Sequence, residues 1–172
     1  MTGSVEPLVV GKVIGDIVDL FAPNVKMSVH FGSKHITNGC TIKPFIAIEP
    51  LKVTIGGESK ELFTLIMTDP DAPSPSEPSM REFVQWIVVD IPGGKDPSKG
   101  REILSYYAPT PKVGIHRYAL VLFKQKEALG EVEKPEKRAN FRTRIFAETH
   151  GLGLPVATTY FNAQKEPQKK KK

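Results

Sequence analysis

The chain has 172 residues, of which 40% are hydrophobic and 25% are charged. This size and composition predict one soluble globular domain with its own core. They exclude a helical membrane protein, because no apolar run approaches the roughly 20 residues that span a bilayer. A single cysteine, Cys40, excludes an intramolecular disulfide and favours a reducing, intracellular compartment. We also expect no signal peptide, since Met1 to Pro7 has neither a basic start nor a long apolar core.

The net charge of +5 is concentrated at one end of the chain. Lys169 to Lys172 supply four of the excess positive charges, and the remainder carries only about +1. We therefore expect a domain over residues 1–167 and a flexible basic tail over 168–172. Such a tail attracts anionic lipid, nucleic acid or acidic protein surfaces, or it only aids solubility. The nearly neutral body does not indicate a nucleic-acid-binding face, so no direct nucleic-acid binding is expected.

Helical patterns are few along the chain. Apolar side chains recur at spacings of three and four over residues 8–19, which predicts a short amphipathic helix despite Gly11 and Gly15. A second helix is predicted over 141–149, with Asn140 as its N-cap and Gly151 at its end. The charged stretch 126–136 between the two has no apolar face and is predicted to be a mobile external loop.

Strand patterns dominate instead. Residues 25–31 alternate between apolar and polar side chains, which is typical of a half-exposed strand. Further strands are predicted at 52–55, 64–68, 83–90, 119–125 and 156–163. Because no strand–helix–strand alternation is present, we expect a mainly antiparallel sheet.

Two proline-stiffened loops carry the polar groups of greatest interest. Asp69 and Asp71 follow a buried-type strand and stand among four prolines, which would hold both carboxylates in fixed positions, as a binding site requires. The alternative is that both aspartates only form Asx turns. His116 opens a later strand after Pro109 and Pro111, where a histidine is more often a structural hydrogen-bonding residue.

Reactive groups are hard to find in this sequence. Cys40 has no base placed beside it, no G-x-S-x-G segment occurs, and the four histidines are scattered. We therefore expect no catalytic residue, no metal site and no cofactor. A small hollow with a carboxylate, an imidazole and aromatic or proline walls suits binding of a small polar group without chemistry.

The residues around these loops resemble a known family. The segments Asp69-Pro70-Asp71-Ala72-Pro73-Ser74 and Gly114-Ile115-His116-Arg117 are similar to the two signatures of the phosphatidylethanolamine-binding proteins, and the resemblance runs from about Pro7 to Glu166. Segments 7–16, 35–40 and 160–167 look like the plant MOTHER OF FT group. The resemblance implies a large antiparallel Greek-key sheet packed on a smaller sheet, with a few short peripheral helices.

The resemblance also implies an anion pocket at one end of the sheet. In the family this pocket takes phosphate or a phospholipid head group. Carried over by position, its residues here are Asp69, Gln85, Pro111 and His116, with Phe83 near the mouth and Asp71 in support.

Two departures from the family pattern change what the pocket can do. Gln85 stands where the family usually has a histidine, and a glutamine cannot become a cation as the pH falls. This predicts weaker and less pH-dependent anion binding, unless the pocket is vestigial. Phe83 stands where florigens have tyrosine and repressors have histidine, and Ala139 stands where florigens have glutamine. Neither of those two identities is therefore supported.

The resemblance implies a non-enzymatic regulatory adaptor, linked to seed germination and hormone response. Plant relatives join 14-3-3 proteins to bZIP transcription factors, and we expect a monomer in the cytoplasm and nucleus. The matching partner surface here is Lys60, Pro92, Lys99 and Ala128, with Arg138 and Ala139 in the external loop. Lys60 lacks the bidentate fork of arginine, which weakens the expectation of 14-3-3 binding.

Two other functions remain open. One is a phospholipid or phosphate-ester binding protein in which ligand occupancy is the function, with peripheral membrane association through the tail. The other is a protease inhibitor, as among some distant relatives, although no inhibitory loop is marked in this sequence.

Overall fold

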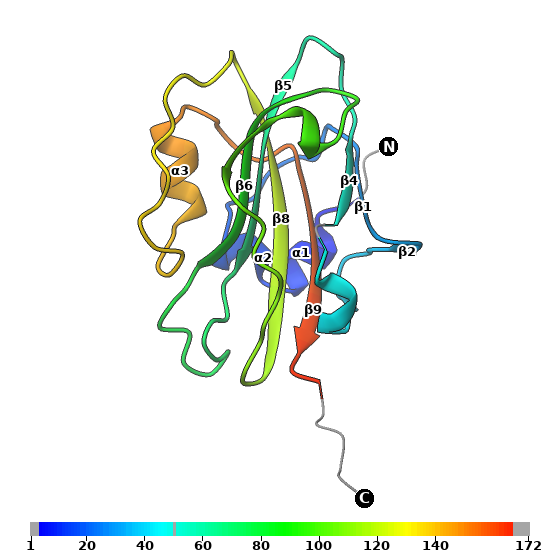
Figure 1. Ribbon diagram of the computed structural model, residues 1–172, viewed down its shortest axis with the longest axis vertical. Helices are drawn as coiled ribbons and strands as arrows, with labels where there is room; N and C mark the ends of the chain where they lie inside the picture. The colour runs from blue at the N-terminus through cyan, green and yellow to red at the C-terminus, as the bar shows by residue number, and fades with distance from the viewer. Residues whose placement is uncertain (1–3, 50, 167–172) are drawn as a thin grey trace, which may run out of the picture.

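Most of the regular secondary structure consists of strands (Figure 1), as the sequence predicts. The computed structural model describes residues 4–49 and 51–166, so the predicted basic tail lies outside the described residues. No helix in these ranges is long and apolar enough to cross a bilayer.

The large sheet has six strands in the order β3-β9-β8-β5-β6-β7. These strands are β3 (Cys40–Thr41), β9 (Ala157–Gln164), β8 (Ile115–Gln125), β5 (Leu62–Asp69), β6 (Phe83–Pro92) and β7 (Arg101–Leu104). Every neighbouring pair is antiparallel except β3 with β9, which is parallel. The expectation of a mainly antiparallel sheet is confirmed.

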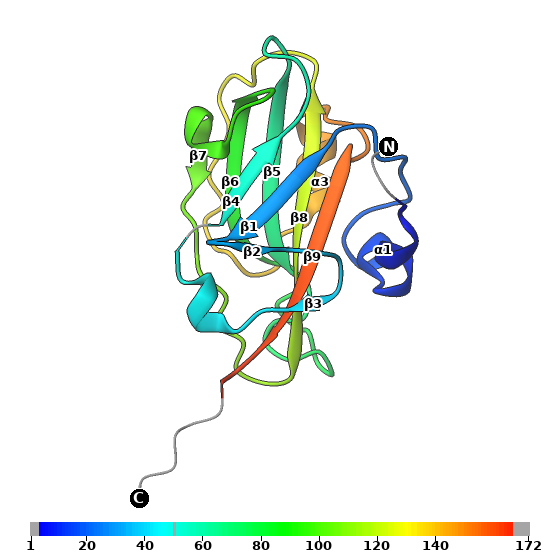
Figure 2. The ribbon, with the colours of Figure 1, turned by 90° about the vertical axis from the view of Figure 1, so that its right-hand side faces the viewer.

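A small sheet packs on one face of the large one (Figure 2). It contains β2 (Lys34–His35), β1 (Met27–Phe31) and β4 (Lys52–Ile55), all antiparallel. The core between the sheets is apolar and includes Phe31, Leu120 and Phe161. The ring of Phe161 meets Phe31 edge-on and stacks on Tyr118, with 5.4 Å between ring centroids in both pairs. One aromatic residue thus links the two sheets.

Short helical elements cover the other face of the large sheet. They are α1 (Glu6–Val10), α2 (Val13–Asp16) and α3 (Thr143–Thr149), whose buried side chains include Leu8, Val13 and Phe146. Two 3-10 turns, η1 (Pro44–Ala47) and η2 (Pro97–Lys99), lie in connections. Because both faces of the large sheet are covered, β5 reads as a nearly continuous apolar run instead of an alternating one.

The single helix predicted over residues 8–19 is wrong. The helix ends at Val10, Lys12 has a left-handed backbone with φ of 61°, and Ile14 and Gly15 are not helical. Gly11 lies against the tyrosine ring of Tyr160, where a Cβ would stand 2.3 Å from the hydroxyl oxygen. Tertiary packing against β9 therefore overrides the periodicity of the segment.

The predicted N-cap of the last helix is also wrong. Asn140 has φ of 62°, and its side chain donates a hydrogen bond to the Ser79 carbonyl at 2.9 Å. The residue before α3 is Arg142, and the Thr143 amide donates to the carboxylate of Glu82 at 3.1 Å. A buried side chain distant in sequence thus caps the helix, which local patterns could not reveal.

The external segment 126–136 has no regular structure, as predicted, and its start is fixed to the sheet. The carboxylate of Asp90 accepts a hydrogen bond from the Leu129 amide at 2.9 Å. The guanidinium of Arg101 donates to the Leu129 and Gly130 carbonyls at 2.6 and 2.7 Å. The predicted mobility of this segment remains a prediction.

Candidate functional site

Asp69 and His116 meet at one end of the large sheet. Because β5 and β8 are antiparallel, the end of β5 lies beside the start of β8. Asp69 Oδ2 lies 2.7 Å from His116 Nδ1, and both side chains are buried. Asp69 Oδ1 also accepts the Asp71 amide at 2.8 Å, which is an Asx turn. The Asx turn of the alternative interpretation is therefore present, and a binding role for Asp69 remains a prediction.

Both ring nitrogens of His116 face acceptors. Nε2 lies 2.9 Å from the Val113 carbonyl, while Nδ1 faces the Asp69 carboxylate. Only a doubly protonated imidazole can donate to both at once. Burial alone would lower the pKa of His116, but the hydrogen bond and charge of Asp69 outweigh it and raise that pKa above its ordinary value. Both N–H groups of the protonated His116 are therefore engaged within the protein.

This pair predicts a pH-dependent stability. Since the folded pKa of His116 exceeds its ordinary value of 6.5, the native state binds more protons than the unfolded chain. The stabilisation is full below pH 6.5 and is lost as the pH rises through the folded pKa. We expect an NMR titration to place the His116 midpoint above 6.5, and Asp69→Asn to lower it. A wild-type midpoint below 6.5 would contradict the protonated assignment.

Asp71 supports the same loop from behind. Its carboxylate accepts hydrogen bonds from Arg117 Nη2 at 2.7 Å, Arg117 Nε at 2.9 Å and the Arg117 amide at 2.8 Å. Burial raises the pKa of Asp71, but the bonds from Arg117 outweigh it and the net pKa is lowered. Arg117 also pairs with Asp16 at 2.9 Å, which ties the N-terminal segment to the loop. Asp71 therefore positions the site and does not line it.

A cavity of about 240 Å³ opens beside the Asp69–His116 pair. Strand residues supply its floor, the proline loop after Asp69 supplies one wall, and the connection between β7 and β8 supplies the other. Its lining residues are Asp69, Ala72, Pro73, Met80, Phe83, Gln85, Tyr107, Thr110, Lys112, His116 and Tyr118. Four of the predicted pocket residues, Asp69, Phe83, Gln85 and His116, are thus brought together.

Gln85 is held by the opposite wall of the cavity. Its amide nitrogen donates to the Tyr107 carbonyl, and the Tyr107 amide in turn donates to the Gln85 carbonyl at 2.8 Å. The Tyr107 ring meets Phe83 edge-on, with 5.4 Å between centroids. The glutamine therefore fixes the position of Tyr107 in the cavity wall.

Pro111 does not line this cavity. It lines a neighbouring apolar hollow of about 470 Å³, together with Pro44, Pro109, Thr110, Lys112, Lys165 and Glu166. Thr110 and Lys112 border both hollows and were missed by the sequence reasoning. Their position directly beside Pro111 was the available signal. Lys112 brings a cation and Thr110 a hydroxyl to the rim of the cavity.

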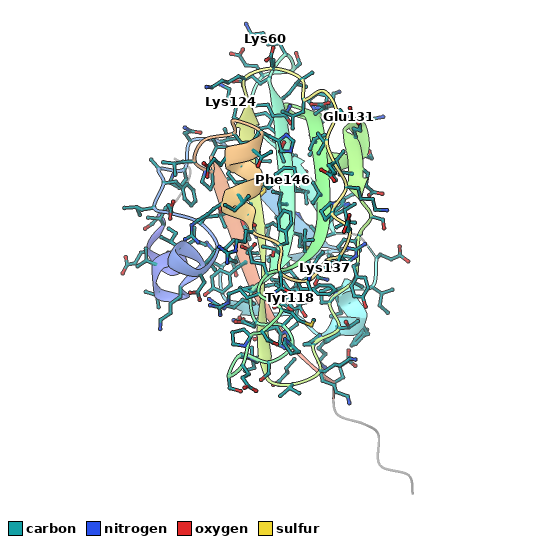
Figure 3. All side chains as sticks on the ribbon, turned by 90° about the vertical axis from the view of Figure 1, so that its left-hand side faces the viewer. Lys60, Tyr118, Lys124, Glu131, Lys137 and Phe146 are labelled. Carbon is teal, nitrogen blue, oxygen red and sulfur yellow. The ribbon has the colours of Figure 1, made fainter. Side chains whose placement is uncertain are left out.

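The predicted partner residues lie in two separate places. Lys60 is exposed in the turn before β5, and Pro92 ends β6 beside that turn. Figure 3 shows Lys60 at the opposite end of the molecule from Tyr118, which lines the cavity. Lys99 is exposed in η2, which packs on β6. Partner binding through these residues remains a prediction.

Arg138 is turned inward, although it was assigned to the partner surface. Its guanidinium donates to the Gln85 carbonyl at 3.0 Å and to the Ser105 carbonyl at 2.8 Å, and it lies 5.0 Å from the centre of the Tyr107 ring. Ala139 is half-buried and lines a third hollow, between the external segment and α3. Arg138 therefore supports the cavity wall from the side of the external segment.

Comparison with known proteins identifies the family. The protein-family model described as "Phosphatidylethanolamine-binding protein" matches residues 19–161. The chain belongs to this family. Within the family, it is 54% identical over its full length to the full length of "Protein MOTHER of FT and TFL1 homolog 2" from Oryza sativa subsp. japonica. It is 49% identical to "Protein BROTHER of FT and TFL 1" from Arabidopsis thaliana, over 96% of this chain and 95% of that protein.

A solved structure shares the fold. The carboxypeptidase Y inhibitor, solved in complex with its cognate proteinase, superposes with a TM-score of 0.84 at 22% identity, over 94% of this chain and 95% of that one. The predicted architecture of the family, a large sheet packed on a smaller one with short helices, is therefore confirmed. The resemblance to plant regulators of the FT and TFL1 type is confirmed by the relatives above.

Proposed function

We propose that this plant-type phosphatidylethanolamine-binding protein is a non-enzymatic regulatory adaptor in seed germination and hormone-response signalling. In this proposal its cavity takes a small phosphate-bearing ligand, either a free phosphate or a lipid head group. Its 54% identity to the rice relative named after MOTHER of FT supports the regulatory part. We further propose that it acts in the cytoplasm and nucleus, where it joins 14-3-3 proteins to bZIP transcription factors.

The proposal of a phosphate-bearing ligand rests on the chemistry of the cavity border. Lys112 and Thr110 supply an ammonium group and a hydroxyl at its border, while the His116–Asp69 pair lies within it. Phosphate oxygens are strong acceptors for such groups. Since both N–H groups of His116 are engaged, Lys112 and Thr110 are the donors that a ligand would meet first.

Phosphate titration followed by NMR tests this assignment. We expect Lys112→Gln to weaken phosphate binding about tenfold, because a hydrogen bond to a charged group is worth about 1.5–3 kcal/mol. Gln85→His should strengthen binding and make it pH-dependent, because the new imidazole becomes a cation as the pH falls. Lys60→Gln, at the far end of the molecule, is the matched control and should leave the affinity unchanged. Equal affinities in all four proteins would overturn the ligand assignment.

The adaptor role is tested separately by affinity capture from source tissue. The wild-type chain is expected to retain 14-3-3 proteins and a bZIP factor, and Lys60→Ala should reduce the captured 14-3-3. Asp69→Lys places a cation beside His116 in the cavity and tests whether partner capture depends on that site. Capture that is identical for wild type and Lys60→Ala would remove Lys60 from the proposed partner surface.

A second candidate is a phospholipid-binding protein whose occupancy is itself the function. The apolar hollow that shares Thr110 and Lys112 with the polar cavity favours it, because a lipid needs both surfaces side by side. An inhibitor role rests only on the similarity to the carboxypeptidase Y inhibitor, and at 22% identity this similarity shows the fold alone.

A further inference from the structure

Exposed apolar side chains gather at the end of the molecule that holds the cavity. Two short segments, 45–48 and 107–115, carry six large apolar or aromatic side chains with more than a third of their surface exposed. These are Phe45, Ile46, Ile48, Tyr107, Val113 and Ile115, with exposed fractions from 38% to 62%. Contiguous apolar surface of this kind marks a site of interaction with another apolar phase or surface.

The two segments lie side by side. The Tyr106 hydroxyl donates to the Ala47 carbonyl at 2.9 Å, and the apolar hollow is lined by Pro44 from one segment and Pro109 to Lys112 from the other. The Phe45 amide donates to the Glu166 carboxylate at 2.8 Å, which adds the end of β9 to the same patch. Figures 1 and 2 both place η1 next to the end of β9. We call this patch, the six apolar side chains together with the hollow lined by their sequence neighbours, the apolar rim.

Positive charge surrounds the apolar rim. Lys43, Lys112 and Lys165 are exposed, and none of them has an ion-pair partner within residues 4–49 and 51–166. Of the two acidic residues in the same segments, Glu166 is engaged by the Phe45 amide, and Glu49 is exposed. Three lysines against two carboxylates leave a small excess of positive charge among the described residues.

Apolar side chains within a ring of lysines match the surface of an anionic membrane. Apolar groups enter the boundary between head groups and acyl chains, while lysines remain at the level of the lipid phosphates. The polar cavity shares Thr110 and Lys112 with this surface, so it would open towards the head groups. A soluble acidic protein would satisfy the lysines but leaves the apolar side chains unexplained.

We propose that this end of the molecule docks on membranes that contain anionic lipids, with the apolar rim inserted and Lys43, Lys112 and Lys165 on the lipid phosphates. This inference rests on the proposed ligand of the cavity, since it states where that ligand is met. It assigns the membrane contact to the folded domain and not to the basic tail alone.

Vesicle flotation of the full chain tests the proposal. We expect binding to vesicles of equal parts phosphatidylcholine and phosphatidylserine, and little binding to phosphatidylcholine alone. Val113→Ser with Ile115→Ser should weaken binding about tenfold, because two exposed apolar side chains no longer enter the bilayer. Lys43→Gln with Lys165→Gln should weaken it about fivefold per lysine. The matched control is Ile145→Ser with Leu154→Ser, similarly exposed apolar residues on α3 and before β9, and it should bind like wild type.

Each alternative gives a distinct result. If a chain ending at residue 167 loses all binding while the Val113/Ile115 variant binds like wild type, the tail alone docks and the proposal is overturned. If that variant alters the oligomeric state measured by sedimentation without vesicles but leaves flotation unchanged, the apolar rim is a contact between copies of the chain. This result also overturns the proposal. Phe45→Ser with Ile48→Ser, in the apolar rim but outside the cavity lining, should weaken flotation in the same way and keep wild-type phosphate affinity by NMR. Loss of membrane docking with intact phosphate binding thus separates this inference from the function of the cavity.

Discussion

Replacing Asp71 with alanine is expected to lower the free energy of unfolding by about 3–5 kcal/mol, the usual cost of removing one partner of a buried ion pair. The Asp71 side chain is 5% exposed and accepts three hydrogen bonds from Arg117. Without it the Arg117 guanidinium stays partly buried with only Asp16 and the Gly11 carbonyl as partners. The proline loop loses its anchor to β8 in the same step. Urea unfolding of the wild type and the variant measures the difference.

A surface pair provides the control for Asp71. Glu61 and Lys124 lie 2.5 Å apart, with the lysine about half exposed. Glu61→Gln should therefore change stability far less than Asp71→Ala does, because surface ion pairs contribute little. If Asp71→Ala costs no more than Glu61→Gln, the cluster behind the loop contributes nothing to stability. Phosphate binding should also weaken in Asp71→Ala, because the Asp69–His116 pair depends on the position of this loop.

Phe161→Ala is expected to cost about 3–5 kcal/mol, the range measured for removal of a buried phenylalanine ring. The ring is fully buried between the two sheets, stacked on Tyr118 and edge-on to Phe31. Tyr118 in turn stacks on His116, with 6.3 Å between ring centroids. The substitution therefore opens a cavity in the core and also removes the support below the imidazole of the site. Thermal and urea unfolding both report the loss.

Phe45→Ala is the matched control for Phe161, because the same side chain is removed from a position that is 57% exposed. Its stability should stay within about 0.5 kcal/mol of the wild type, as for most surface substitutions. A comparable loss of stability in the two variants would show that the packing of Phe161 between the sheets does not account for its contribution to stability. The Phe45 variant should instead lose affinity for anionic vesicles.

Sequence patterns located most strands, but they did not predict the path of the N-terminal segment or the cap of the last helix. The alternation over 25–31 and the apolar runs before Asp69 and Asp90 depend only on which faces are buried, and each corresponds to a strand. The segment 8–19 misled because its periodicity is helical, while contact of Gly11 with Tyr160 decides its path. The cap of α3 comes from Glu82, 61 residues before Thr143 in the sequence, so no local motif could indicate it.

The candidate site likewise has features that the sequence predicts and features that it cannot predict. The family resemblance of two proline-stiffened loops implied that Asp69 and His116 meet, and the structure places Asp69 Oδ2 2.7 Å from His116 Nδ1. Local residue types could not show that both nitrogens of His116 are engaged, because the Val113 carbonyl belongs to the backbone. Nor could they show that Arg117 pairs with Asp16, which requires the path of the N-terminal segment. Contacts between distant segments were the missing information.

The position of β9 has a practical consequence for reporter design. This strand lies inside the large sheet between β3 and β8, and its last residues pair with the start of β8, with Ala163 opposite His116. Glu166 already lines the hollow beside the cavity. A fluorescent protein or affinity handle joined to the carboxyl terminus would therefore be tethered a few residues from the mouth of the site and compete with whatever approaches it. Attachment before α1, on the opposite side of the large sheet from the small sheet, leaves the mouth of the cavity accessible.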